Sequence, residues 1–268
     1  MTALDHALNL TPLSSDDDTL RFGCTFTADW FQGRGAYGGI VAGLFARAFQ
    51  TRVPTRDART MTVHFCAPAT GEGTIEVVLE REGANLSQLS ARLTHLRRGR
   101  VVTVAFATAV FGRDVGPEAY GDRVAPTVPD AHELPIFRLT PGWPVFSEHF
   151  EFRPCLGHQA FRRAPEGHLG GWIRPVEAQP ADLGRVCAIL DAWPPAVLPV
   201  LADPRPAASI DLTFHFFRSF PIAQPDDASF LYEARSPVMR GGYAEEDATL
   251  WDAERRLVAR VRQNVAVF

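Results

Sequence analysis

Two stretches of this sequence occur twice, in the same order, and this repetition constrains the fold more than any other feature. MTVHFCAP (61–68) matches LTFHFFRSFP (212–221), and RVVTVAFATAVF (100–111) matches RLVARVRQNVAVF (256–268). The second copies follow the first by about 150–157 residues. Because two ordered matches at similar spacing are rarely accidental, the sequence indicates a tandem duplication of one structural unit.

The first half predicts a helix followed by an antiparallel meander. Residues 22–30 read as a strand, and four glycines then precede the apolar run 40–50, whose only charge is Arg47. Its apolar residues recur at helical spacing, which predicts a largely buried helix. The hydrophobic period then changes to two, and glycine-rich turns separate four expected strands: 61–68, 73–82, 86–96 and 100–111.

The second half repeats this plan. Strands are expected at 145–154 and 170–176, and Pro180 and Asp182 then open a helix. One face of that helix is apolar and should be buried, through Leu183, Val186, Ile189 and Leu190. Four further strands follow: 209–220, 228–238, 242–254 and 256–268.

Between the halves lies a segment rich in Gly, Pro and Asp, which reads as a linker. The sequence therefore predicts an N-terminal unit over 1–115, a linker over 116–144 and a C-terminal unit over 145–268. Each unit sets one long helix against an antiparallel sheet, so the expected fold class is α+β.

Composition removes several classes of function. The chain contains no lysine: all 27 basic residues are arginines. A Schiff-base lysine and a P-loop lysine are therefore excluded. The net charge of -4 is not that of a general nucleic-acid binder. The four cysteines show no zinc-type spacing and are expected to be reduced and mostly buried. We expect a cytoplasmic enzyme with no signal peptide and no membrane partner, because no basic leader or membrane-length apolar run is present.

Several of these segments carry a family resemblance. GRGAYGGIVAGLFARAF, GGWIRPV, ILDAWPPAVLP, SIDLTFHFFR and the ending GGYAEEDATLWDAERRLVARVRQ together resemble bacterial acyl-CoA thioesterase II and its relatives. The resemblance runs from about residue 20 to the C-terminus and is weakest in the linker. It implies a tandem double hot dog fold, in which each central helix is wrapped by an antiparallel sheet.

The resemblance also implies an activity and its residues. Members of the family hydrolyse an acyl-CoA thioester with an activated water, a reaction of lipid metabolism that needs no cofactor. Asp211 matches the family's Asp and Gln263 its Gln. Ser236 is the nearest candidate for the family's Ser or Thr, although the spacing differs and Arg235 competes for the position. A homodimer is expected, because a double hot dog resembles half of a tetramer of single units.

Each of these residues has suitable chemistry. Asp211 could take a proton from water as a general base. Gln263 offers a donor and an acceptor in one uncharged amide and could orient that water. Gly38 and Gly39 lie at a predicted helix start, where backbone N–H groups can stabilise an oxyanion and the absence of Cβ allows close approach.

Each residue also has a structural interpretation. A strand Asp or Gln usually faces solvent, the two glycines could serve only tight helix–sheet packing, and Ser236 could be a turn residue. The recurring His64 and His215 are better read as structural histidines than as ligands. Two acidic or basic clusters are read as solvated: Glu245, Glu246 and Asp247, and the hairpin arginines Arg97, Arg98 and Arg100, which could otherwise attract CoA phosphates.

Two other functions stay open at this point. The hot dog fold also hosts hydratases and dehydratases on CoA or carrier-protein substrates, although His158 and His168 do not fit their motif. A duplicated unit could also be a non-catalytic acyl-CoA-binding protein. No GxSxG motif occurs, the glycines at 33, 35 and 38 meet the dinucleotide pattern only weakly, and we assign no metal site.

Overall fold

A computed structural model describes residues 1–16, 19–118 and 120–268 of the chain. In the first half, the main strands are β1 (Thr11–Ser15), β2 (Thr19–Phe26), β5 (Asp57–Phe65), β6 (Gly71–Glu82), β7 (Leu86–Arg97) and β8 (Arg100–Gly112). A short hairpin, β3 (Phe31–Gln32) and β4 (Gly35–Ala36), precedes the helix α2 (Gly38–Arg52). A short N-terminal helix, α1 (Ala3–Ala7), was not predicted from the sequence.

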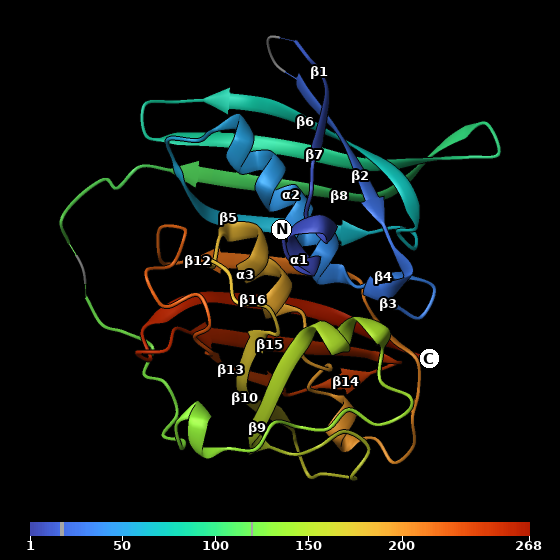
Figure 1. Cartoon of the computed structure of the whole chain (residues 1–268), viewed down its shortest axis with the longest axis vertical. Helices are drawn as coiled ribbons and strands as arrows, with labels where there is room; N and C mark the ends of the chain where they lie inside the picture. The colour runs from blue at the N-terminus through green and yellow to red at the C-terminus, as the bar shows by residue number, and fades with distance from the viewer. Residues whose placement is uncertain (17–18, 119) are drawn as a thin grey trace.

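The second half contains β9 (Phe150–Gly157), β10 (Gly167–Pro175), the helix α3 (Leu183–Leu190), β11 (Ala207–Ser209), β12 (Asp211–Phe216), β13 (Phe230–Ser236), β14 (Met239–Arg240), β15 (Tyr243–Trp251) and β16 (Leu257–Val267). The strand order is β1-β2-β6-β7-β8-β5-β12-β16-β15-β13-β10-β9. All pairs are antiparallel, and β5 pairs with β12, so the sheets of the two halves join at their repeated strands. Figure 1 shows the two halves stacked with α2 and α3 on the same side of this sheet.

The strands predicted from the period-two pattern are confirmed, and three of them need corrected bounds. The strand expected at 209–220 is divided at Ile210 into β11 and β12 and ends at Phe216. The strand expected at 22–30 ends at Phe26, and a 3₁₀ turn (Ala28–Trp30) follows. The strand expected at 145–154 begins at Phe150, after a 3₁₀ turn over Val145–His149. Pro144 precedes that turn, and its fixed φ suits a turn entry better than a sheet interior.

The helix predictions hold with one correction. The residues of α2 from Gly39 to Phe49 are buried apart from Arg47, as the single charge suggested. The shorter α3 is buried on every side, not on one face, because it packs against α2 as well as against the strands β10 and β15. No helix in the described residues is long and apolar enough to cross a membrane.

Glycines allow α2 and α3 to cross closely. A Cβ on Gly39 would lie 2.9 Å from the carbonyl oxygen of Ala188, and one on Gly43 would lie 2.6 Å from that of Gly184. These glycines therefore allow the two helices to pack closely on each other. The structural interpretation from the sequence was close packing of the helix on the sheet. The crossing brings the start of α2 to the end of α3.

The segment expected to link the halves is folded back onto the second half. The indole N–H of Trp172 donates to the carbonyl of Pro129, and that of Trp251 to the carbonyl of Arg123. The N–H of Phe137 donates to the carbonyl of Phe152 on β9. Residue 119 of this segment lies outside the described residues.

The four cysteines are free thiols, as expected. Cys24 and Cys187 are buried, whereas Cys155 is half-buried and Cys66 is exposed. The expectation that most would be buried therefore holds for two of the four. Burial raises the pKa of the Cys24 thiol to about 12, so this group stays protonated and unreactive near neutral pH.

Candidate active site

A carboxyl group lies where the C-terminus of α3 meets the N-terminus of α2. Asp191 directly follows α3, and the backbone N–H of Gly39 donates a hydrogen bond to its carboxyl. Its Oδ2 atom sits so close to Gly38 that a Cβ there would be 2.8 Å away. The two helices, which pack side by side in Figure 1, therefore hold a carboxylate against a helix start that has spare N–H donors.

The electrostatics of Asp191 are unusual for a carboxylic acid. The residue keeps some accessible surface, yet protein surrounds its carboxyl. Burial and, second to it, the charge of Glu246 raise the pKa of Asp191 to about 8, against the opposing effect of the Gly39 N–H. Because a general base works best with a pKa near the operating pH, this environment suits proton transfer.

Glu246 is a second buried carboxyl beside the first. It lies on β15, is 2% exposed and accepts a hydrogen bond from the N–H of Ala196. Burial raises the pKa of Glu246 to about 7, while the bonds from Ala196 and Gln263 lower it. Since two charges are disfavoured together in a buried site, the pair retains protons at a pH where ordinary carboxyls have lost them.

Gln263 connects Glu246 to the seam between the halves. Its Nε2 donates to Oε1 of Glu246 at 2.7 Å, and its Oε1 accepts from the hydroxyl of Ser209 at 2.6 Å. The register of β15 and β16 sets Gln263 directly opposite Glu246. Both ends of the amide are therefore fixed, and its orientation follows from the hydroxyl donor on one side and the carboxylate acceptor on the other.

Aromatic side chains enclose this polar cluster. Tyr37 donates its hydroxyl to the carbonyl of Ala188 at 3.2 Å, and Tyr232 stacks on Trp193 with ring centroids 5.7 Å apart. Burial raises the pKa of both tyrosines, and the charge of Asp191 raises it further. Excluding water in this way strengthens every electrostatic interaction within the cluster.

The N-terminus of α2 also offers a free donor. The N–H of Ile40 bonds to the carbonyl of Tyr37, and that of Gly39 bonds to Asp191. Among the described residues, the N–H of Gly38 has no hydrogen-bond partner. The space that a Cβ on Gly38 would take is filled by Oδ2 of Asp191, the ring of Phe65 and a methyl of Leu212, which lie 2.8, 3.0 and 3.4 Å from that position.

The three residues predicted to hold the water lie at one end of the second-half sheet without touching one another. Gln263 is buried in the cluster. The structural interpretation, in which this side chain faces solvent, is therefore wrong. Ser236 is 8% exposed, and its hydroxyl donates to the carbonyl of Glu245 at 2.7 Å. Asp211 is half-buried and accepts the N–H of Asn264 at 3.0 Å, on the opposite face from the core residue Leu212.

Two buried acids were missed from the sequence. Glu246 was read as solvated with its neighbours, which is wrong: Glu245 and Asp247 do pair with surface arginines, but Glu246 points inward. The alternation of β15 carried this signal, since Ala244, Glu246, Ala248 and Leu250 share one face. Asp191 could also have been noticed in the sequence, because it is a charged residue that directly follows the apolar helical segment 186–190.

The histidines singled out in the repeat lie away from this cluster. His64 stacks on Phe106 at 4.8 Å, and His215 is exposed. His168 pairs with Glu233 at 3.0 Å on the sheet of the second half. His64 and His168 therefore have ring or ion-pair partners on the sheet, whereas none is found for the exposed His215 within the described residues.

Solved structures with the same fold have low sequence identity to this chain. A hot dog protein of unknown function from Alicyclobacillus acidocaldarius superimposes with a TM-score of 0.86, at 24% identity over 100% of this chain and 98% of that one. An acyl-CoA thioesterase II from Mycobacterium marinum gives 0.74, at 20% identity over 99% and 98%. These likenesses confirm the α+β double hot dog fold. A search of curated proteins found no match.

Two protein-family models match this chain. The model of the acyl-CoA thioesterase C-terminal domain matches residues 122–267, and that of the N-terminal domain matches residues 26–112. The chain therefore belongs to the acyl-CoA thioesterase family. Membership of this family supports a thioesterase activity in general terms.

Proposed function

We propose that this protein hydrolyses an acyl-CoA thioester at the junction of α2 and α3, with Asp191 as the general base. The observation that carries the proposal is the contact of a buried, high-pKa carboxyl with a glycine helix start. A base and an oxyanion donor then lie next to each other, as acyl transfer to water requires.

The proposed reaction has two steps. Asp191 takes a proton from water while the water oxygen attacks the thioester carbonyl carbon, and the carbonyl π electrons move onto oxygen. The N–H of Gly38, with the N-terminal dipole of α2, stabilises that oxyanion. The tetrahedral intermediate then collapses, the C–S bond breaks, and the proton held by Asp191 passes to the leaving thiolate. The products are the free acid and CoA.

Glu246 and Gln263 are assigned positioning roles in this proposal. Glu246 does not need to touch the substrate, because its charge acts at a distance and adds to the rise in the pKa of Asp191 that burial produces. Gln263 holds Glu246 in place through the 2.7 Å bond, and Ser209 fixes the amide from the other side. Removing Gln263 would leave a buried carboxylate with one donor fewer.

Thiol release from a panel of acyl-CoAs, from acetyl to palmitoyl with one aromatic acyl group, tests the proposal. We expect hydrolysis of at least one member and a loss of kcat of about a hundredfold or more in Asp191→Asn, as removal of a general base implies. Release from no member, with folded protein and saturating substrate, would contradict a thioesterase and favour the acyl-CoA-binding function.

The family resemblance supports a competing proposal for the base, namely Asp211 with Gln263 and Ser236. The same assay separates the two. Asp211→Asn is the matched control, because it makes the same chemical change at a half-buried carboxylate that bonds to the N–H of Asn264. We expect Asp211→Asn to retain most of the turnover. A hundredfold loss in Asp211→Asn with an active Asp191→Asn would transfer the role of base to Asp211.

We further propose that the protein acts in lipid metabolism in the cytoplasm, as a homodimer. The proposal of a dimer is supported by apolar side chains left exposed near the seam of the two halves. Phe106 on β8 is 37% exposed, and Ile210 and Phe217 at the two ends of β12 are 39% and 51% exposed. A second copy would remove this surface from water.

A further inference from the structure

A cavity of about 340 Å³ lies in the second half, where the linker folds back beside β9 and β10. Four aromatic residues from three separate segments line its interior: Phe137 and Trp143 of the linker, Phe152 of β9, and Trp193, which lies just after α3. Small-molecule sites have volumes of about 300–1,000 Å³ and are lined mainly by such side chains. The interior therefore suits one small apolar group.

The four rings form a continuous wall. The ring centroids of Phe137 and Trp143 are 5.2 Å apart, those of Trp143 and Phe152 6.1 Å, and those of Phe152 and Trp193 5.2 Å. The N–H of Phe137 donates to the carbonyl of Phe152 at 2.7 Å, which ties the linker to β9 at this point. Because the wall is already packed, a ligand would lose little affinity to the ordering of side chains.

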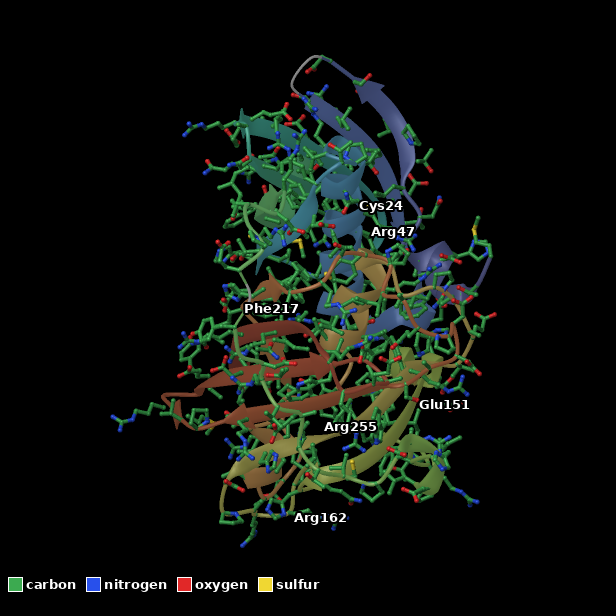
Figure 2. All side chains as sticks on the ribbon, turned by 90° about the vertical axis from the view of Figure 1, so that its left-hand side faces the viewer. Cys24, Arg47, Glu151, Arg162, Phe217 and Arg255 are labelled. Atoms are coloured by element: carbon green, nitrogen blue, oxygen red, sulfur yellow. The ribbon has the colours of Figure 1, made fainter. Side chains whose placement is uncertain are left out.

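The mouth of the cavity is polar and carries basic side chains. His158 and Gln159 line it and are exposed, and Arg162 donates to Oε1 of Gln159 at 3.2 Å. Arg138 directly follows the lining residue Phe137. Within the described residues, no ion pair is found for Arg138, His158 or Arg162. Figure 2 labels Arg162 at the end of the second half.

The acids of the neighbouring segments do not neutralise this mouth. Glu151 on β9 binds Arg174 at 2.7 Å, and Glu166 lies 3.9 Å from Arg235. The exposed Asp203 belongs to the loop after Leu201, and it forms no ion pair with the mouth within the described residues. The mouth therefore keeps a positive charge, next to an interior that is apolar.

The cavity is separate from the candidate active site. Neither Asp191 nor Gly38 belongs to its lining. Trp193, which does line it, stacks on Tyr232 with ring centroids 5.7 Å apart, and Tyr232 is the ring that feels the charges of Asp191 and Glu246. Two stacked rings thus lie between the cavity and the buried acids.

We propose that this cavity is a second, non-catalytic site that binds a small monocarboxylic acid. A ring or short chain lies among the four aromatic side chains, and the carboxylate lies at the mouth beside His158 and Arg162. A guanidinium group matches a carboxylate in both charge and shape. An apolar body with one negative charge fits both parts of the cavity. The inference goes beyond the proposed function, because it involves no thioester and no step at Asp191.

Calorimetry with 3-phenylpropanoate and its neutral amide, 3-phenylpropanamide, tests the inference. In the double variant His158→Gln/Arg162→Gln, we expect Kd for the acid to rise about fivefold, since two exposed charge contacts are lost, and Kd for the amide to stay unchanged. In Trp143→Ala, Kd should rise about tenfold for both compounds, because an aromatic wall is lost. Added salt should weaken binding of the acid only.

Arg100→Gln is the matched control, because Arg100 is an exposed arginine on the β7–β8 hairpin of the first half. It should leave both Kd values unchanged. The inference is overturned if the native protein does not bind the acid, or if the double variant binds it as tightly as the native protein. Saturating hexanoyl-CoA, added to Asp191→Asn, should leave Kd for the acid unchanged. Competition between them would show that the cavity is not a separate site.

Discussion

Asp191 couples folding to pH in the opposite direction from an ordinary surface carboxylate. Its pKa is about 8 in the folded protein and near 3.8 in an unfolded chain, so the folded state binds the proton more tightly. The free energy of unfolding should therefore fall as the pH rises from about 4 to 8, where the folded carboxyl must lose its proton.

This linkage gives a prediction for Asp191→Asn. The amide is never charged, so the variant should be more stable than the native protein by roughly 5 kcal/mol at pH 8, because each unit of a raised pKa corresponds to about 1.4 kcal/mol, with little difference at pH 4. Urea denaturation at the two pH values measures this difference. Equal stability of the two proteins at both pH values would show that the carboxyl is not desolvated.

Glu246 should control the pH at which the enzyme becomes active. In the native protein, kcat/KM should rise with pH up to about 8, because Asp191 must be deprotonated to act as a base. In Glu246→Gln the charge that raises the pKa of Asp191 is absent, so the rising limb should move to lower pH. A pH–rate profile that keeps its midpoint in Glu246→Gln would argue against this coupling, whereas a purely structural role would lower the rate at all pH values.

At the scale of elements, the crossing of α2 and α3 builds the site. The two helices belong to different halves, and neither contains both a carboxyl and a free helix start for the reaction. Gly39 and Gly43 let the backbones approach until Asp191 reaches the N–H of Gly39. The packing of the duplicated units thus decides whether the site exists at all.

Gly43→Ala should disturb this crossing. The new methyl group would lie 2.6 Å from the carbonyl oxygen of Gly184 and 2.7 Å from a methyl of Leu8, so the helices must move apart. We expect a loss of about 1–3 kcal/mol of stability by overpacking, measured by urea denaturation, and a reduced kcat. Gly23→Ala is the control, because its methyl group would be 3.6 Å from the nearest atom, and it should change stability by less than about 0.5 kcal/mol. Equal stability of both variants would mean that the crossing is not tightly packed.

At the scale of the whole molecule, the continuous sheet makes one body of the two halves. β5 and β12, the strands that carry the repeated His-Phe sequence, pair with each other at the seam. Near this seam lie the exposed apolar residues Phe106, Ile210 and Phe217, the last of which Figure 2 labels at the molecular edge.

Sedimentation at low micromolar concentration tests the proposed dimer. We expect a species of twice the 29.5 kDa chain mass. A change of Phe106 and Ile210 to polar residues should shift the protein toward monomer without unfolding it, since neither side chain is part of the core. A native protein that sediments only as a single chain would contradict the proposal.

Several features could be predicted from the sequence because they depend on local patterns. The runs with a hydrophobic period of two predicted the strands, and the apolar run with a single arginine predicted α2. The two segments that recur in the same order predicted the duplication. The partial failures have local causes too. The turn over Val145–His149 was taken for strand, and Glu246 was taken for a solvated residue because its neighbours are charged.

The sequence by itself determined the α+β class, the tandem repeat and the family, since composition, hydrophobic period and repeated segments are properties of the chain alone. Only the tertiary structure brought Asp191 to Gly38 and Gly39, about 150 residues earlier, and Glu246 to Gln263. The pKa values of the two acids follow from that enclosure, because desolvation depends on which atoms of distant segments surround a carboxyl, and a linear pattern does not record this.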